Sequence, residues 1–305
     1  MKAIVLSEYG GPEKLELRDC PEPEPGAGQI KVRVLSASLN PVDWKLRSGQ
    51  LQRAMPIELP TILGRDAAGA VVKVGAGVTA FSVGDRVLGL TNAGYAEFVV
   101  APAQGWATLP DGLGARDAGA YPLVLLTGDQ LIAATLESAH GSGSGLTVLV
   151  TGAVGAVGRV AVWVAKQRGC TVLAGVRTKQ VEEAKKLGAD GIVALDDETS
   201  LAQLAPVERI ADTVSGETVA RLLPKLKRGG IVSSALGEPP SAKERGIKVH
   251  AFHTQPDGQR LTELSQAVAS GRLVVPIAKH FALAEAAAAH ALAERGSVGK
   301  VLLNP

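Results

Sequence analysis

Cysteine is scarce in this sequence, and long apolar runs are absent. Only Cys20 and Cys170 occur among 305 residues and no Cys-x-x-Cys pair is present, which excludes a disulfide scaffold and a cysteine-bound zinc lobe. No window of about 18 residues is free of charges and helix breakers, so we expect no transmembrane helix. The N-terminal apolar run is too short for a signal peptide. We therefore expect a cytoplasmic protein, because two isolated thiols suit a reducing compartment.

Charge of one sign is also lacking. The formal net charge is +2 and charged residues make up 20% of the chain, which is an ordinary balance without the basic excess typical of nucleic-acid binding. We expect neither a nucleic acid nor a membrane as partner. A chain of 305 residues has ample apolar material for two domains.

The chain shows two different patterns of predicted secondary structure. Up to about residue 122, short β-type runs such as Ile30–Leu35 alternate with glycine-rich turns, which is typical of a barrel-like β domain. From residue 123 onward helical and strand-like segments alternate, which predicts an α/β fold with a doubly wound parallel sheet. The end of the chain changes again, with an alanine-rich helix over Ala282–Glu294 and a final strand.

Three glycines mark the exit of one predicted buried strand into a helix. The segment LTVLVTGAVGAVGRVAVW (residues 146–163) places Gly152, Gly155 and Gly158 between a β-branched run and a helical apolar stripe that starts at Val157. Main-chain N–H groups and the positive end of the helix dipole at such a place bind a pyrophosphate. The alternative is a tight turn without a ligand. The residues predicted to contact the cofactor here are Gly152, Val154, Gly155, Ala156 and Val157.

The end of the next strand indicates which dinucleotide binds. An NAD site usually carries an acid there, about twenty residues beyond the glycines, for the ribose 2′-hydroxyl. This chain instead has Arg177, Thr178 and Lys179, whose positive charges suit the 2′-phosphate of NADP(H). The alternative is a solvated basic start of a helix.

At this point the sequence resembles the medium-chain dehydrogenase/reductase superfamily, and within it the zinc-independent quinone oxidoreductase branch that includes zeta-crystallin-like proteins. The resemblance covers essentially the whole chain. Its pieces, in order, are SLNPVDWKLRSG (38–49), LGRDAAGAV (63–71), VGDRV, GYAEFVVAP (94–102), LPDG, PLVLLTG, the glycine loop, DTVSGE (212–217) and the region from His290 to Leu303. The resemblance implies a Rossmann domain over residues 123–272, a GroES-like β-barrel domain over 1–122 and 273–305, and a homodimer.

The chain departs from the zinc-dependent relatives of this superfamily. Where those enzymes have a cysteine and a His-Glu pair, this sequence has Asn40 or its neighbours, then Arg65 and Asp66. Arginine is permanently protonated and does not bind Zn²⁺. The five histidines, none of which shows metal-ligand spacing, are His140, His250, His253, His280 and His290. We therefore predict no metal site.

The segment NPVDWK supplies three catalytic candidates, of which the resemblance implies the first. Asn40 matches a cofactor and substrate contact near the nicotinamide, and Lys45 is a candidate donor to an enolate oxygen. Asp43 is expected to orient the segment, by pairing with Lys45 or Arg47. The alternative for all three is a capped turn with solvated basic side chains.

Two further residues are implied to contact the cofactor. Thr127 matches a family position close to the nicotinamide, and Lys300 matches one near the cleft between the domains. Their alternatives are an ordinary threonine at a helix start and a lysine at a strand edge. Some relatives place a tyrosine near the 2′-phosphate where this chain has Leu195, so the preference for NADPH is expected to be looser here.

These features predict an NADPH-dependent reductase that transfers hydride to a small quinone or α,β-unsaturated carbonyl without zinc. The negative charge that develops on the substrate oxygen then needs hydrogen-bond donors. An enoyl-thioester reductase and a non-catalytic NADPH-binding protein are the alternatives.

Overall fold

The computed structural model describes residues 1–139, 141–239, 241–296 and 298–305. These residues form two compact units, which we describe separately. The first unit contains Met1–Leu123 and Pro256–Pro305, and the second contains Val124–Gln255. His140 lies outside the described residues.

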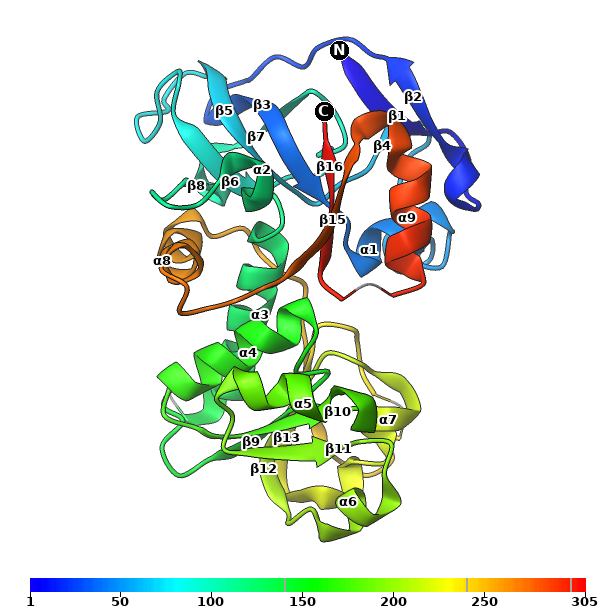
Figure 1. Cartoon of the computed structure of the whole chain (residues 1–305), viewed down its shortest axis with the longest axis vertical. Helices are drawn as coiled ribbons and strands as arrows, with labels where there is room; N and C mark the ends of the chain where they lie inside the picture. Colours follow the sequence, from blue (N-terminus) through cyan, green and yellow to red (C-terminus); the bar gives the residue numbers. More distant parts are fainter. Residues whose placement is uncertain (140, 240, 297) are drawn as a thin grey trace. The chain divides into compact units, whose positions relative to one another are not determined.

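The second unit is built on a six-stranded parallel sheet (Figure 1). Its strands are β9 (Thr147–Thr151), β10 (Thr171–Val176), β11 (Gly191–Ala194), β12 (Val207–Asp212), β13 (Leu226–Ser234) and β14 (Lys248–Ala251). Their spatial order is β11-β10-β9-β12-β13-β14, so the order reverses between β9 and β12. This is the strand order of a Rossmann fold, in which ligands bind at the reversal point. The predicted doubly wound sheet is confirmed.

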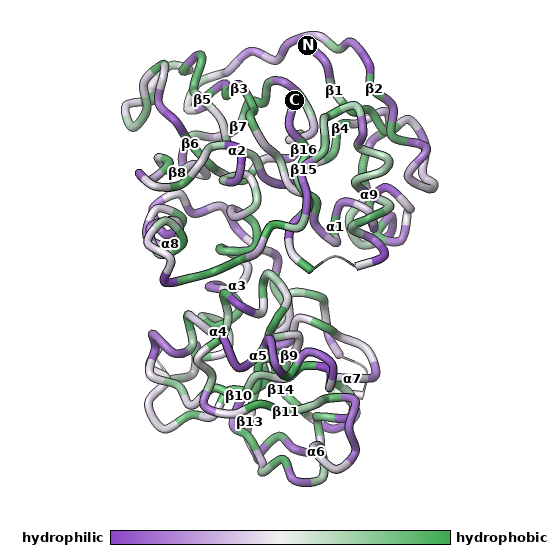
Figure 2. The backbone as a smooth tube through the Cα atoms, viewed as in Figure 1, coloured by the Kyte–Doolittle hydropathy of each residue, from purple (hydrophilic) through white to green (hydrophobic). Residues whose placement is uncertain are grey.

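The helices of the second unit follow the apolar periodicity of the sequence. They are α3 (Pro122–Thr135, which begins at the end of the first unit), α4 (Ala156–Gln167), α5 (Val181–Ala184), α6 (Glu198–Gln203) and α7 (Gly216–Ala220). In Figure 1, α4 and α5 lie over β9 and β10. The predicted stripe of α4 is buried from Val160 onward. In Figure 2 the short α5 is hydrophilic, and its helical segment ends at Gly188 with φ +70°.

One helix of the second unit is shorter than its sequence suggests. We expect a helix over TVARLLPKL (residues 218–226), but α7 ends at Ala220 and a separate 3-10 turn covers Leu223–Lys225. Pro224 explains the break, because it has no N–H to continue the α-helical hydrogen bonds.

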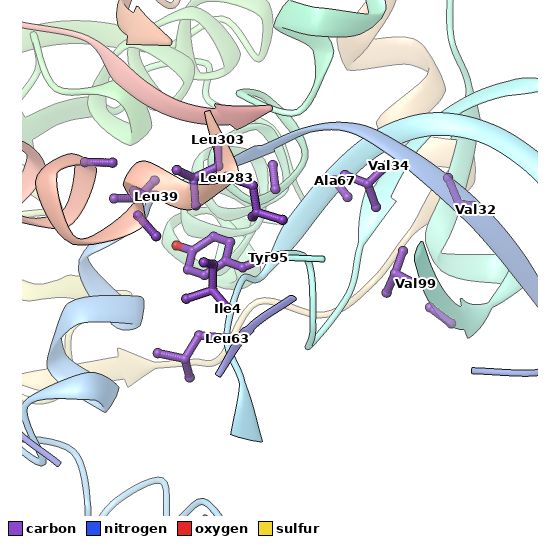
Figure 3. Packing of buried hydrophobic residues seen from close by; sticks show 14 of the residues in the cluster. Ile4, Val32, Val34, Leu39, Leu63, Ala67, Tyr95, Val99, Leu283 and Leu303 are labelled. Atoms are coloured by element: carbon purple, nitrogen blue, oxygen red, sulfur yellow. The ribbon is translucent and has the colours of Figure 1, made fainter. Parts of the chain in front are cut away.

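The first unit contains two antiparallel-rich sheets. One has the order β2-β1-β4, and the other has the order β15-β16-β3-β5-β6-β8 with β7 paired to β3. The strands are β1 (Lys2–Leu6), β2 (Leu15–Asp19), β3 (Gln29–Ser38), β4 (Thr61–Ile62), β5 (Asp66–Val74), β6 (Arg86–Leu90), β7 (Phe98–Pro102), β8 (Trp106–Thr108), β15 (Ile277–Ala282) and β16 (Lys300–Asn304). Figure 3 shows the ring of Tyr95 in the core of this unit, with Ile4 and Leu39 beside it.

The end of the chain completes the first unit. Strand β16 pairs with β3, and α9 (Ala286–Glu294) buries Ala286, Ala289 and Ala293 in the same core. The other helices of this unit are α1 (Pro41–Arg47), α2 (Ala115–Ala118) and α8 (Gly258–Ala269). The sequence-based boundary at residues 272 and 273 differs from the division of the structure at 255 and 256. Helix α8 packs on β8, where a Cβ on Gly258 would lie 2.1 Å from the Trp106 carbonyl oxygen.

Candidate functional site

The glycine loop lies at the reversal point of the parallel sheet, between β9 and α4. Gly152 has φ +61°, and a Cβ there would lie 2.6 Å from Thr213 Oγ1. A Cβ on Gly158 would lie 2.2 Å from the Gly152 carbonyl oxygen, so only glycine lets α4 approach the loop this closely. Gly155 is exposed and directly precedes α4, whose first N–H groups have no acceptor within the helix. Each glycine therefore has its own structural role. Gly152 has a left-handed backbone, Gly155 precedes the helix, and Gly158 lets α4 pack closely on the loop.

A buried hydrogen-bond network that the sequence reading missed fixes the strand ends below this loop. The Asp212 carboxylate at the end of β12 accepts from Thr151 Oγ1 of β9 (2.9 Å) and from Ser234 Oγ of β13 (2.8 Å). It also accepts from the main-chain N–H groups of Val214 and Ser215, both at 2.9 Å. The three side chains are fully buried. Asp212 belongs to the DTVSGE segment, which served above only as part of the family resemblance.

Arg159 is a second residue that sequence reasoning missed. Its side chain is only 6% exposed although it is the fourth residue of α4. Nε donates to the Val154 carbonyl oxygen at 3.0 Å, and the guanidinium forms a 2.5 Å ion pair with Glu183 of α5. Hydrogen bonds from Lys186 and Arg159 lower the pKa of Glu183 to about 2. Arg159 thus connects the glycine loop to the helix that follows β10. The sequence could have indicated this role, because Arg159 stands beside the apolar stripe of its helix.

The predicted 2′-phosphate residues are all exposed at the carboxyl end of β10. Within the described part of the chain, neither Arg177 nor Lys179 donates a side-chain hydrogen bond or forms an ion pair, so both cations face solvent. Thr178 differs from the expectation. Its main-chain N–H and its Oγ1 both donate to Asp196 Oδ1, at 2.7 and 2.8 Å, so these donors are already occupied. Leu195, at the position where some relatives have tyrosine, is buried.

Thr127 lies on α3 and is 7% exposed. Its hydroxyl lies 2.7 Å from Thr254 Oγ1, beyond the end of β14. The next turn of α3 is attached to the same segment, because Gln130 exchanges two hydrogen bonds with the main chain of Gln255. The contact of Thr127 with a nicotinamide stays a prediction.

In the first unit, polar residues from widely separated segments, among them Asn40, Asp66 and Lys300, come together in a buried cluster. Lys300 Nζ donates to Asn40 Oδ1 (2.5 Å) and to the Leu39 carbonyl oxygen (2.9 Å). Asp66 accepts from the N–H and hydroxyl of Ser38, at 3.0 and 2.8 Å, and from Asn40 Nδ2 at 3.3 Å. The buried members of this cluster, which we call the Asn40–Lys300 cluster, are Ser38, Asn40, Asp43, Asp66, Tyr95 and Lys300.

Asp43 orients the segment NPVDWK by a different contact from the one expected. Its Oδ2 accepts from the Asn40 N–H at 2.8 Å and so caps the first turn of α1. It pairs with neither Lys45 nor Arg47. The buried Arg47 instead forms a 2.9 Å ion pair with Glu294 of α9, and its Nε donates to the Gly10 carbonyl oxygen at 3.1 Å. Lys45 is half-buried in the last turn of α1 and makes no side-chain hydrogen bond or ion pair among the described residues.

Burial governs the protonation of the cluster. Desolvation and the neighbouring Asp66 charge raise the pKa of Asp43 to about 7. Desolvation likewise raises the pKa of Asp66, although Lys300 opposes this, and it lowers the pKa of Lys300 against the attraction of the two carboxylates. The Tyr95 hydroxyl has its pKa raised by burial and by the Asp43 charge. One lysine thus compensates two buried acids.

The elevated pKa of Asp43 predicts a pH-dependent stability. A carboxyl whose pKa rises from 3.8 to about 7 on folding stabilises the fold below pH 4, and this contribution is lost as the pH rises through 7. In Asp43→Asn, which keeps the acceptor for the Asn40 N–H, this loss is absent. We expect the free energy of unfolding of wild type relative to this variant to fall by about 2–3 kcal/mol between pH 5 and pH 8. Urea denaturation at both pH values measures it, and parallel pH profiles for the two proteins would contradict it.

Asn40, Arg65 and Asp66 stand where the zinc-dependent relatives have metal ligands, and their chemistry does not fit a zinc ion. Asn40 and Asp66 are already bonded within the cluster, and the ammonium of Lys300 supplies the positive charge there. Arg65 has no lone pair to offer a metal. No group of three His, Cys, Asp or Glu side chains in the described ranges is close enough to hold a metal ion.

Comparison with known proteins identifies the class that this fold and this loop define. Residues 26–111 match the family model "Alcohol dehydrogenase GroES-like domain", and residues 187–303 match "Zinc-binding dehydrogenase". The chain belongs to the medium-chain dehydrogenase/reductase superfamily. The predicted family and fold class are confirmed, including the GroES-like domain within the first unit.

Within this superfamily the chain is similar to quinone oxidoreductases. It is 30% identical, over its full length and 98% of the relative, to the chloroplast envelope quinone oxidoreductase homolog of Arabidopsis thaliana. The solved quinone oxidoreductase of Coxiella burnetii superposes with a TM-score of 0.87 at 29% identity, covering 100% of this chain and 99% of that one. A mycobacterial protein solved in complex with NADPH superposes with a TM-score of 0.84 at 31% identity and full coverage of both chains.

Proposed function

We propose that this protein is a zinc-independent reductase that uses NADPH to reduce quinones or α,β-unsaturated carbonyls. One observation carries the proposal: the second unit combines a glycine loop at the reversal point of a parallel sheet with two cations at the end of the neighbouring strand, Arg177 and Lys179, that have no ion-pair partner among the described residues. The similarity to quinone oxidoreductases and to an NADPH-bound structure supports it.

The residues of the second unit fit a dinucleotide phosphate. The N–H groups of Ala156 and Val157, which have no acceptor within α4 because they stand in its first turn, would bind the pyrophosphate, and the Gly152 and Gly155 backbone leaves room for it. Arg177 and Lys179 would bind the 2′-phosphate. When bound, NADPH supplies a hydride from C4 of its nicotinamide.

Lys45 is the best donor in the first unit for charge that develops on a substrate oxygen. Asn40 and Lys300 bond to each other, so their polar atoms already have partners. Lys45 has three free donors on the same short helix that Asp43 caps. A positioned ammonium stabilises an enolate oxygen better than a neutral donor does. Asn40, Asp43 and Lys300 would then act by holding this segment in place.

The proposal is tested by following the oxidation of NADPH through its absorbance at about 340 nm. Four substrates are compared: a benzoquinone, a naphthoquinone, an alkenal and a crotonyl thioester. Turnover of the quinones or the alkenal is the expected result. Turnover of the thioester alone would replace the proposal with an enoyl-thioester reductase. Binding of NADPH with no turnover of any substrate would leave a non-catalytic nucleotide-binding protein.

Lys45→Met is expected to lower kcat/KM for an enone by about 10- to 100-fold, since one charge-assisted hydrogen bond to the developing oxyanion is lost. The dissociation constant of NADPH should not change. Steady-state kinetics and fluorescence titration measure the two quantities. Lys45→Arg, which keeps a charged donor, should recover part of the activity, and wild-type turnover in the methionine variant would remove Lys45 from the reaction.

We also propose a homodimer that pairs the two copies through β14. This strand (Lys248–Ala251) is at the end of the parallel sheet and has β13 as its one neighbour within the described residues. An unpaired edge strand presents free N–H and C=O groups to a second copy.

No helix among the described residues is long and apolar enough to span a membrane. The cytoplasmic location stays a prediction.

A further inference from the structure

Asp196 lies beside the cations proposed for the 2′-phosphate. It follows β11, the strand that pairs with β10, and Val176 at the end of β10 is opposite Ala194. Asp196 is exposed, and its Oδ1 accepts both the N–H and the hydroxyl of Thr178. Thr178 stands directly between Arg177 and Lys179 in the sequence. The carboxylate therefore holds the same donors that a bound phosphate would use.

The negative charge of Asp196 is present at neutral pH. The two hydrogen bonds from Thr178 hold the pKa of the carboxyl below its usual range, and the charge of Arg177 lowers it further. The effect on Arg177 is reciprocal, because a fixed negative charge offsets part of the positive potential that Arg177 offers to a ligand. A 2′-phosphate carries nearly two negative charges at this place, whereas a 2′-hydroxyl carries none.

We propose that Asp196 is a specificity-determining residue that reduces the preference of this protein for NADPH over NADH. It does so by repelling the 2′-phosphate with a carboxylate that Thr178 holds in place. The proposal rests on the proposed use of NADP(H) and specifies which residue limits it. NADH lacks the phosphate, so the charge of Asp196 leaves its affinity nearly unchanged.

Asp196→Asn separates this role from a structural one. An asparagine at this position still accepts from the Thr178 N–H and hydroxyl, so the link between β10 and β11 remains, while the charge is lost. The matched control is Asp190→Asn. Asp190 also accepts from a β10 main-chain N–H, that of Val172, and it pairs with Lys166, but it lies at the amino end of the strand pair.

The experiment measures the dissociation constants of NADPH and NADH by fluorescence titration of the full chain at low salt. In Asp196→Asn we expect NADPH to bind about five- to tenfold more tightly, which is the effect of removing one charge several Å from a phosphate in water. The dissociation constant of NADH should stay within about twofold of the wild-type value. The gain in NADPH affinity should shrink at about 1 M NaCl, because salt screens exposed charges. In Asp190→Asn both constants should match wild type.

Two failures are distinguishable. If wild type binds both dinucleotides and Asp196→Asn leaves the ratio of their dissociation constants unchanged, the role of Asp196 is overturned while the proposed function stands. Equal changes in the NADH and NADPH dissociation constants are one form of this result, and they indicate a purely structural effect. If wild type binds neither dinucleotide, the proposed function itself fails.

Discussion

Lys300→Met is expected to lower the free energy of unfolding by about 3–5 kcal/mol at pH 8. Lys300 is 5% exposed, and its ammonium compensates the buried carboxylates of Asp66 and Asp43. Methionine has a similar length but leaves both acids without a counter-charge. At pH 5 the loss should be smaller, because the pKa values of the two acids rise further in the variant and protonation neutralises them. Urea denaturation at the two pH values measures the difference.

Two further variants test whether the loss comes from charge. Lys279→Met changes an exposed lysine on the adjacent strand β15 that lies over the Phe281 ring, and its loss should not exceed about 1 kcal/mol. Adding Asp66→Asn to Lys300→Met should restore part of the stability, since it removes one uncompensated acid. A double variant less stable than Lys300→Met would contradict this explanation.

The second large effect is expected in the second unit. Arg177→Asp should weaken NADPH binding by roughly 30- to 100-fold, because it removes a charge-assisted hydrogen bond to the 2′-phosphate and adds a repulsive charge next to Asp196. NADH affinity should change by no more than about threefold, so the preference is erased or reversed. Titration of both dinucleotides measures the two constants.

Arg228→Asp is the matched control for this charge reversal. Arg228 is exposed near the amino end of β13, at the opposite edge of the parallel sheet from the glycine loop. Both dissociation constants should match wild type in this variant. An unchanged ratio of the NADPH and NADH dissociation constants in Arg177→Asp would show that Arg177 does not bind the 2′-phosphate.

Local patterns in the sequence were enough for the second unit's central features. The strand up to Thr151, the glycines and the buried stripe of α4 are neighbours in sequence, so their spacing reports their geometry directly. The position of Arg177 and Lys179 just after β10 was also predicted this way, and their contact with a 2′-phosphate stays a prediction. The extra 3-10 turn after α7 was predicted as helix, since a single proline outweighs the apolar periodicity around it.

Contacts between distant segments could not be read from one sequence. Asp196 meets Thr178 across 18 residues, and Asp212 joins three strand ends, because the strand order of the sheet brings them together. Lys300 meets Asn40 across 260 residues, and only the family resemblance associated these two. The segment from Pro256 to Arg272 joins the first unit through the close approach of Gly258 to Trp106, which leaves no mark in composition.

The hydrogen bond from Arg159 to the Val154 carbonyl has a consequence for how fast and how tightly a dinucleotide binds. This carbonyl is held by a side chain that is itself fixed by Glu183, so the peptide group after Val154 does not rotate freely. We therefore expect a bound dinucleotide to cost less backbone entropy than it would at an unrestrained loop. The loop would then act as a preformed receptor rather than one that forms around its ligand.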